Sequence, residues 1–217
     1  MSLTRLGKRA AAVATAAIVA SALTAAPAAA QGKKPLKTKS LAAVLTADKK
    51  GFDRNGHDYD ILAAAVKAVL KAKPGSPVKV LGDGTKRVTA FLPNDRAFQL
   101  LVADITKSKR LPGEKKAFTA VAGLGIGTVE SVLLYHVVPG ATITKKAALK
   151  SDNARLKTAA GSKIKVNVYG PRWHKRISLI DADRSDRNPR VNRFDINKGN
   201  RQIGHGIDRV LRPINLP

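Results

Sequence analysis

The sequence predicts a mixed α+β domain in which helices come first and strands follow. Apolar residues recur at helical spacing through the first half of the chain, and they alternate with polar residues through much of the second half. Because helices and strands are segregated, a parallel sheet built from alternating βαβ units is disfavoured. Residues 31–217 are enough for one domain with its own hydrophobic core.

The first 30 residues are predicted to be a secretory signal that is removed from the mature protein. Arg5, Lys8 and Arg9 form a basic start, an Ala-dominated apolar run follows, and Ala28–Ala30 supply the small residues that a signal peptidase accepts. A transmembrane anchor is the rival interpretation, but alanine is only weakly hydrophobic and polar residues interrupt the run. We therefore expect a secreted protein of bacterial type, extracellular or loosely associated with the cell wall.

Residues 31–39 form a basic stretch that we expect to be a flexible arm, so that the folded domain covers residues 40–217. The chain has no cysteine, which excludes disulfides, thiolate metal sites and thiol nucleophiles. Burial of apolar surface therefore has to stabilise the fold. No apolar segment after the signal is long enough to cross a bilayer.

Helical periodicity is found in four segments of the domain: residues 40–47, 60–73, 95–105 and 117–122. Ser40 is suited to cap the first of them, and Asn94 or Asp95 the third, because their side-chain oxygens can accept from the free amides of a first turn. A further segment, 128–138, is expected to begin as a helical turn and to continue as a strand.

Strand patterns dominate the second half. Residues 161–170 place Ile164, Val166 and Val168 on one side and polar residues on the other, which indicates a half-buried strand. Two short strands are expected within 78–93 around the turn Gly82–Gly84, because that turn is flanked by apolar residues. Further strands are expected at residues 176–181 and 202–211, and the polar stretch 181–200 between them is expected to be irregular.

Four stretches, in this order, resemble the motifs of the fasciclin (FAS1) domain family. They are FLPNDRAF at 91–98, LLYHVVPG at 133–140, LKTAAGSKIKVNV at 156–168 and IGHGIDRVLRP at 203–213. Together they extend over most of residues 40–213. The family's motif positions fall here on Phe91, Pro93, Asn94, Asp95, Phe98, Tyr135, His136, His205 and Asp208, and we expect them to be mainly structural.

The resemblance implies a wedge of mostly antiparallel β-strands flanked by several α-helices. It also implies extracellular adhesion, without catalysis or a cofactor, to matrix, wall components or cell-surface proteins. Two features depart from the family. Gly204 and Gly206 stand where the family usually has bulky apolar residues, which indicates a bulge or a close backbone approach. The connection 169–201 is longer and richer in arginine than is usual.

The pair Tyr135 and His136 is either an adhesive or catalytic element or a polar strut inside the core. On a strand, adjacent side chains point to opposite faces, so the two rings cannot easily act together. Apolar residues on both sides predict that at least one ring is buried. A buried imidazole has to pair both nitrogens, most readily with backbone groups. We therefore expect both residues to be part of the architecture.

Catalytic and metal-binding patterns are weak. There is no Gly-x-Ser-x-Gly turn, and the Ser-x-x-Lys matches at Ser76 and Ser162 lie in unsuitable contexts. The four histidines are scattered, without the spacing of zinc ligands. Two loops resemble calcium loops, but turns closed by their own Asx side chains explain them better. These loops contain Asp53, Asn55, Asp58 and Asp60, and Asp181, Asp183 and Ser185. We expect no metal and no enzyme.

Positive charge is the strongest compositional signal. The formal net charge is +25, and loss of the three basic residues of the signal leaves +22. Such a field attracts polyanions and makes their association sensitive to salt. The alternative is that surface lysines and arginines only keep a secreted protein soluble.

The binding residues that we predict lie around the single tryptophan and in the arginine-rich connection. Guanidinium groups suit sulfate, phosphate and carboxylate oxygens, and an indole can stack on a sugar ring. Pairing with nearby aspartates is the alternative, but residues 171–201 hold nine Lys and Arg and only four Asp. The predicted binding residues are Arg172, Trp173, Lys175, Arg176, Arg184, Arg187, Arg190 and Arg193.

These observations lead to one hypothesis and two alternatives. The hypothesis is a secreted, non-enzymatic binding domain whose basic face attaches to an anionic polysaccharide or to another surface or matrix component. The first alternative is an extracellular hydrolase with an unrecognised acid–base pair. The second is a secreted nucleic-acid-binding protein, which is disfavoured because nine aromatic residues in the whole chain offer few stacking platforms.

Overall fold

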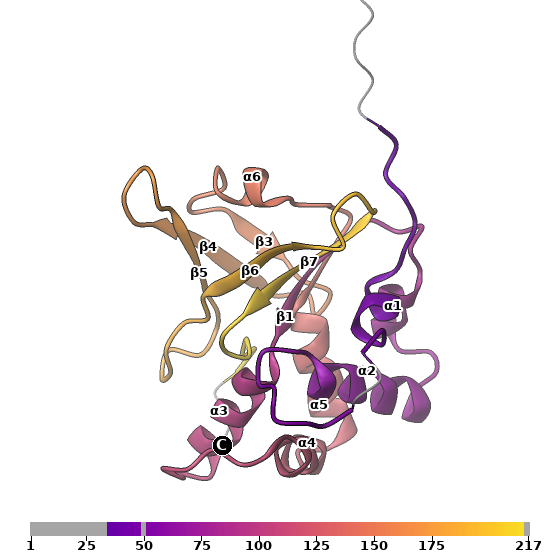
Figure 1. Ribbon diagram of the computed structural model, residues 1–217, viewed down its shortest axis with the longest axis vertical. Helices are drawn as coiled ribbons and strands as arrows, with labels where there is room; N and C mark the ends of the chain where they lie inside the picture. Colours follow the sequence, from indigo (N-terminus) through magenta and orange to yellow (C-terminus); the bar gives the residue numbers. More distant parts are fainter. Residues whose placement is uncertain (1–33, 49–50, 215–217) are drawn as a thin grey trace, which may run out of the picture. The chain divides into compact units, whose positions relative to one another are not determined.

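The computed structural model describes residues 34–48 and 51–214. The chain divides into two compact units, Met1–Lys34 and Pro35–Pro217, and almost all described residues belong to the second. The predicted signal, residues 1–30, lies outside the described residues. Within them, seven helices and two sheets form a mixed α+β fold, which confirms the predicted class (Figure 1).

The helices are α1 (Leu41–Leu45), α2 (Asp60–Ala72), the 3₁₀-helix η1 (Pro77–Gly82), α3 (Asp95–Ile105), α4 (Glu114–Gly123), α5 (Ile126–Tyr135) and α6 (Lys145–Ala148). Two predicted caps are confirmed: Ser40 Oγ accepts from Ala43 N at 3.2 Å, and Asn94 Oδ1 accepts from Ala97 N at 3.0 Å. Of the described helices, none alone is long and apolar enough to cross a membrane. Only α4 and α5 together, bent by 106° where they meet, satisfy that test of length and composition.

The strands are β1 (Val88–Pro93), β2 (Val137–Pro139), β3 (Arg155–Lys157), β4 (Lys163–Tyr169), β5 (Arg176–Ile180), β6 (Val191–Ile196) and β7 (Gln202–Ile207). One sheet has the order β2-β1-β7-β6 and the other β3-β4-β5. β1 and β7 are parallel, and the other four pairs between these strands are antiparallel. The prediction of mostly antiparallel strands is therefore confirmed.

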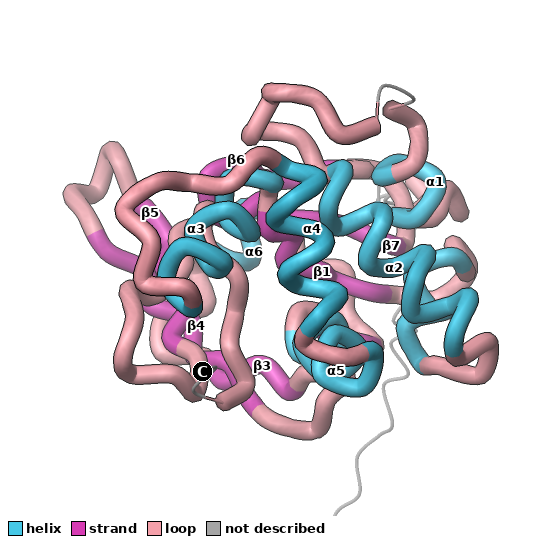
Figure 2. The backbone as a smooth tube through the Cα atoms, turned by 90° about the horizontal axis from the view of Figure 1, so that it is seen from below, coloured by secondary structure: helices cyan, strands magenta, loops and turns pink. Residues whose placement is uncertain are grey.

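Two apolar clusters hold the domain together. The larger one joins the helices to one side of β1, through residues such as Ile61, Leu92 and Leu133. Seen from below, α2, α4 and α5 lie over β1 (Figure 2). The second cluster fills the space between the two sheets, where Phe91 meets Leu179 and other apolar residues. Burial in both clusters is the main stabilising contribution, since the chain has no disulfide.

The expected strand at 78–81 is wrong, because this segment is the 3₁₀-helix η1. Ser76 Oγ accepts from Val78 N at 3.3 Å, and Pro77 occupies the first turn, where its missing N–H costs nothing. Val78 and Leu81 are three residues apart, so a 3₁₀ turn buries both on one side. Over four residues, the pattern Val78-Lys79-Val80-Leu81 could not distinguish this turn from a strand.

The stretch 181–200 is not irregular throughout, because it contains β6. Its pairing with β7 shifts register twice, at Val191/Arg193 and at Arg193/Ile196, and these bulges interrupt the alternation that identifies a strand. On β7, a Cβ at Gly206 would lie 2.5 Å from Tyr59 Oη, and one at Gly204 would lie 2.5 Å from Leu92 Cδ1. The expected bulge and close approach are therefore both present.

Part of the predicted flexible arm is tied to the domain. Lys37 N donates to Gly199 O at 2.9 Å, and Arg201 N donates to Lys37 O at 2.8 Å. Lys39 N donates to Asn200 Oδ1 at 2.9 Å. Residues 37–39 thus run beside the turn between β6 and β7, and the expectation that the arm is free as far as residue 39 is wrong.

Candidate functional site

Trp173 and its basic neighbours lie at the tip of the β4–β5 hairpin. Gly170 adopts a left-handed conformation with φ +95°, and His174 N donates to Pro171 O at 2.9 Å, which closes the turn. Trp173 is 87% exposed. Arg172, Lys175 and Arg176 are exposed as well, so the indole and three cations are available to a partner.

The other four predicted arginines lie at the far end of β5 and on β6. Arg184, Arg187, Arg190 and Arg193 are all exposed, and Arg193 also hydrogen-bonds the hydroxyl of Tyr59. The hairpin tip and the loop 181–190 lie at opposite ends of β5 (Figure 1). A five-residue strand spans about 16 Å, so the predicted residues form two groups rather than one site.

The aspartates of the loop 181–190 turn inward and pair with the C-terminal segment. Arg212 is 5% exposed and contacts Asp183 and Asp186 at 3.3 Å each, while Arg212 N donates to Asp181 Oδ2 at 2.8 Å. Burial raises the pKa of Asp181 to about 7. Over residues 34–48 and 51–214, no carboxylate oxygen lies within 4.0 Å of a side-chain nitrogen of Arg184, Arg187, Arg190 or Arg193. The alternative in which these aspartates neutralise the loop arginines is therefore wrong.

The structure adds a basic surface that the sequence reasoning missed: the outer face of the sheet β3-β4-β5. Ile164 and Val166 point inward, so Lys163 and Lys165 point outward. The register pairs Arg155 with Lys165, and Lys157 with Lys163. Arg176 of β5 lies on the same face, opposite Tyr169. The three strands contain no Asp or Glu, and the alternation of bases in R-L-K and K-I-K was the available signal.

A groove lies beside this basic face, where the loop 181–190 passes β4 and β5. It has a volume of about 340 Å³ and is lined by Tyr169 and Ser178 of the sheet and by Arg187 and Arg190 of the loop. Backbone bonds fix its shape, since Leu179 N donates to Pro189 O at 2.9 Å. The groove therefore joins part of the predicted arginine group to the sheet.

The sequence predicted Tyr135 and His136 on a strand. This prediction is wrong, because both residues lie at the C-terminal end of α5. The His136 ring is 3% exposed, with Nδ1 donating to Val132 O at 2.7 Å and Nε2 accepting from Leu211 N at 2.9 Å. Burial lowers its pKa to about 4, so the ring is neutral at physiological pH. Tyr135 is fully buried and donates to Lys163 O at 3.3 Å. Neither ring is available to a ligand.

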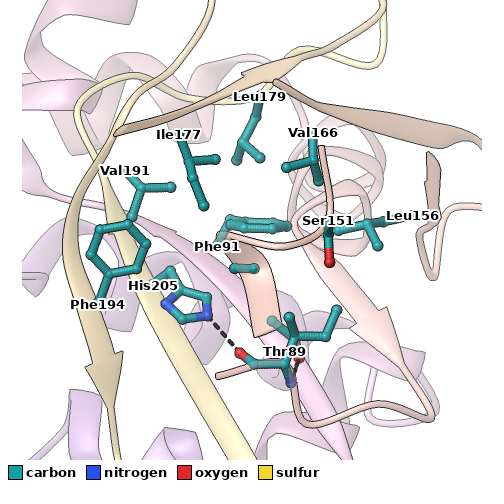
Figure 3. Close-up of a pocket in the computed structure, with 12 residues that line it drawn as sticks. Thr89, Phe91, Ser151, Leu156, Val166, Ile177, Leu179, Val191, Phe194 and His205 are labelled. Carbon is teal, nitrogen blue, oxygen red and sulfur yellow. Dashed lines mark hydrogen bonds between the residues drawn. The ribbon is translucent and has the colours of Figure 1, made fainter. Parts of the chain in front are cut away.

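His205 is paired in a similar way, next to a small apolar cavity between the sheets (Figure 3). Its Nε2 donates to Ile143 O at 2.8 Å, and its Nδ1 accepts from Asp195 N at 3.3 Å. The rings of Phe91 and Phe194 pack beside the imidazole. The cavity measures about 20 Å³, room for roughly one water molecule, so it is no ligand site.

The remaining motif residues also serve the scaffold. Phe91 and Phe98 are buried, Pro93 ends β1, and Asn94 caps α3. Asp208 Oδ1 accepts from Arg190 N at 2.7 Å and so fixes the start of β6.

Five carboxylates meet where three helices begin. Asp60, Asp95 and Glu114 are the first residues of α2, α3 and α4, and Asp53 and Asp58 belong to the loop before α2. Asp53, Asp58 and Asp60 offer oxygens that all lie within 4.8 Å of one another, and so do Asp58, Asp95 and Glu114. Sequence reasoning noticed the loop but missed Asp95 and Glu114 as its neighbours, because they are distant along the chain.

Backbone amides hold this carboxylate cluster in place. The carboxylate of Asp95 accepts from Asp60 N at 3.1 Å and Ile61 N at 2.9 Å, and so caps α2, whose own N-cap residue Tyr59 makes no side-chain cap bond. Glu114 Oε2 accepts from Asp53 N at 2.6 Å. Burial, followed by the adjacent Asp58, raises the pKa of Asp95 to about 8. Burial and neighbouring acids also raise the pKa values of Asp60 and Glu114.

Comparison with models of protein families matches residues 60–213 to the fasciclin domain. This span is more than half of the chain and includes all four motifs. The chain belongs to the fasciclin domain family.

Among solved structures, the FAS1 domain of this chain is similar to a FAS1 domain pair from the insect cell adhesion molecule fasciclin I, with 20% sequence identity and a TM-score of 0.53. The match covers 82% of this chain and 51% of that chain, so this chain spans about half the length of the pair. At this identity the likeness supports the fold alone. No curated protein matches the chain.

FAS1 domains are generally non-catalytic and are associated with adhesion or binding. The geometry agrees with that: the Ser76 hydroxyl, one candidate nucleophile, accepts from Val78 N as a helix cap and is buried. The two histidines of the FAS1 motifs pair with backbone groups rather than with a hydroxyl.

Proposed function

We propose that this FAS1 domain binds an anionic extracellular polymer, such as an acidic polysaccharide, across the outer face of the sheet β3-β4-β5. One observation carries the proposal: on this face Arg155 lies opposite Lys165, and Lys157 opposite Lys163. Directly opposed like charges destabilise a sheet, and these strands have no acid to offset them. A polyanion that lies on the face removes the repulsion.

The spacing of the cations suits a repeating ligand better than a single small anion. Neighbouring strands are about 4.8 Å apart, and alternate residues along a strand are about 6.6 Å apart. An exposed pair of opposite charges contributes little by itself, roughly 0–1 kcal/mol, so several must act together. A polymer with a charged group on each sugar can meet several of these bases at once.

The hairpin tip and the groove extend this face in two directions. Arg176 connects the face to Arg172 and Trp173, whose indole can stack on a sugar ring. At the other end, Arg187 and Arg190 line the groove. Nucleic acid is the less suitable polyanion, because binding of bases needs several aromatic platforms and this surface offers only Tyr169 and Trp173.

The proposal includes export from the cell. The basic start, apolar run and small-residue end of residues 1–30 support it, as does an adhesive role for which the partner lies outside.

The test compares two fourfold variants that change the net charge equally. The face variant combines Arg155→Gln, Lys157→Gln, Lys163→Gln and Lys165→Gln. The control combines Lys71→Gln, Lys79→Gln, Lys109→Gln and Arg110→Gln, all exposed residues on other elements. Binding of residues 31–217 to polygalacturonate and to heparin is measured calorimetrically at low and at high NaCl.

We expect the face variant to bind at least about tenfold more weakly than the control, and the wild type to weaken steeply with salt. An equal loss in both variants means that net charge alone attracts the polymer, and it overturns the proposal. So does an affinity that salt leaves unchanged, or duplex DNA that binds more tightly than either polysaccharide.

A further inference from the structure

Within residues 34–48 and 51–214, the carboxylate cluster at the starts of α2, α3 and α4 has no cationic partner. The chain contains 40 Lys and Arg but only 15 Asp and Glu, so a buried acid should find a base easily. Yet across residues 34–48 and 51–214, no Lys or Arg nitrogen lies within 4.0 Å of a carboxylate oxygen of the cluster. Its members are Asp53, Asp58, Asp60, Asp95 and Glu114.

The helix dipoles offset only part of this charge. Each helix N-terminus is equivalent to about half a positive charge, so three of them supply roughly +1.5 against five carboxylates. Negative charge therefore remains in a place where burial makes it costly.

Several oxygens of the cluster also lack a hydrogen-bond donor. Glu114 is 2% exposed, and its Oε1 is buried without a partner. Asp60 is 8% exposed, and its Oδ2 is also buried without a hydrogen-bond partner among the described residues. Neither oxygen of Asp58 receives a bond from an N–H or hydroxyl of the described residues. Leaving such groups unpaired lowers the stability of the folded state unless a ligand supplies the missing interaction.

We propose that this cluster binds one calcium ion, held by Asp58, Asp95 and Glu114, whose oxygens all lie within 4.8 Å of one another. All the donors are carboxylate oxygens, the ligands that hard cations such as Ca²⁺ prefer. Asp58 belongs to both groups of three oxygens that lie within 4.8 Å of one another, so it links the loop to the starts of α3 and α4. Calcium tolerates six to eight oxygens in flexible geometry, whereas Mg²⁺ demands a near-ideal octahedron.

The three ligands come from the loop before α2, from α3 and from α4, and Asp95 N holds the loop by donating to Asp58 O at 3.1 Å. A bound ion therefore ties three elements together. It should stabilise the folded state, since the unfolded chain has no such arrangement. The site shares no residue with the basic face of β3-β4-β5, so the two proposals are independent.

The test measures thermal unfolding of residues 31–217 after treatment with a chelator, and again with 10 mM CaCl₂, with 10 mM MgCl₂ and with NaCl of equal ionic strength. If the dissociation constant is about 0.1 mM, we expect Ca²⁺ to raise the melting temperature by about 5 °C or more. Magnesium should have a smaller effect and NaCl none. Calorimetric titration with CaCl₂ should give a stoichiometry of one.

Matched variants decide whether the cluster is the site. Asp58→Asn and Glu114→Gln should weaken calcium binding at least tenfold and remove the calcium-dependent shift. Both should still fold without calcium, and Asp58→Asn should melt no lower than the wild type there, because repulsion is relieved. Glu130→Gln changes the only other glutamate and should keep the full shift.

Two outcomes overturn the proposal. One is a wild-type melting temperature that is the same in chelator and in CaCl₂, with no heat of binding; the cluster is then a proton-sharing group of the scaffold. The other is a calcium response that Asp58→Asn and Glu114→Gln leave intact, which places the ion elsewhere.

Discussion

The Tyr135–His136 motif and the carboxylate cluster are both buried polar groups at helix ends, but they are satisfied in opposite ways. Both nitrogens of His136 meet backbone partners. In the cluster, oxygens of Asp58, Asp60 and Glu114 meet none among the described residues. Buried polar groups in native folds are normally paired, so an internally paired group serves the scaffold and an unpaired group points to a ligand.

The same comparison appears in their electrostatics. The C-terminus of α5 favours a cation, by about 0.3–1 kcal/mol in exposed settings. Burial outweighs this and lowers the pKa of His136 to about 4, so the ring carries no charge there. In the cluster, burial raises the pKa of Asp95 to about 8 despite the bond from Ile61 N. Burial therefore favours the neutral form of the imidazole at the end of α5 and the protonated form of Asp95 in the carboxylate cluster.

The largest effect should follow from removal of the paired imidazole. His136→Ala leaves Val132 O and Leu211 N without partners and opens a small cavity. We expect a loss of about 3 kcal/mol in the free energy of unfolding, measured in urea at pH 7. His174→Ala, at the exposed hairpin tip, should stay within about 0.5 kcal/mol of wild type. A His136 variant as stable as that control would mean that the ring does not brace the core.

A smaller effect is expected from pH in the presence of a chelator. The pKa of Asp95 lies well above its ordinary value, so the folded state binds more protons than the unfolded state between about pH 4 and 8. Stability due to this group is present at low pH and is lost as the pH rises through about 8. His136 acts in the opposite direction, but only below pH 6.5, so the window from pH 6.5 to 8.5 isolates the acids.

Urea unfolding across that window should show a fall of about 2–3 kcal/mol, to which Asp181, with a pKa raised to about 7, contributes the smaller part. Asp95→Asn should flatten the slope, and Asp181→Asn should remove a separate part of it. A loss of capping in Asp95→Asn would lower stability equally at every pH, so the slope distinguishes titration from a structural defect. An unchanged slope in Asp95→Asn would show that Asp95 is already ionised.

Local chemistry could be predicted from the sequence where one short stretch decides it. The caps Ser40 and Asn94 and the alternation of β4 depend on neighbours within a few residues, and all three were predicted correctly. The motif containing His136 identified a buried ring but not its place, because a helix end followed by a three-residue strand has the same apolar pattern as one strand.

The surfaces of opposite charge could not be predicted, because each is assembled from distant segments. Asp58 and Glu114 meet only after the loop before α2 has docked on α3 and α4. The opposition of Arg155 and Lys165 depends on the β3–β4 register. The late arginines fall into two groups for the same reason, since β5 separates the hairpin tip from the loop 181–190.

The smallest effect concerns the basic face, where like charges oppose each other at the surface rather than in the interior. Replacing Arg155 and Lys157 by Gln should raise the free energy of unfolding by a few tenths of a kcal/mol at low ionic strength, about 0.2–1 kcal/mol in total, because two cross-strand repulsions disappear. Salt screens exposed charges, so the gain should shrink at 1 M NaCl, where the Debye length is about 3 Å. Lys79→Gln with Lys116→Gln, at exposed helical sites with no other base three or four residues away, should give no such salt-dependent gain. If the face variant is less stable at every salt concentration, the lysine and arginine side chains stabilise the sheet by packing. The basic face would then not be a surface whose like charges destabilise the fold, in contrast to the internally paired His136.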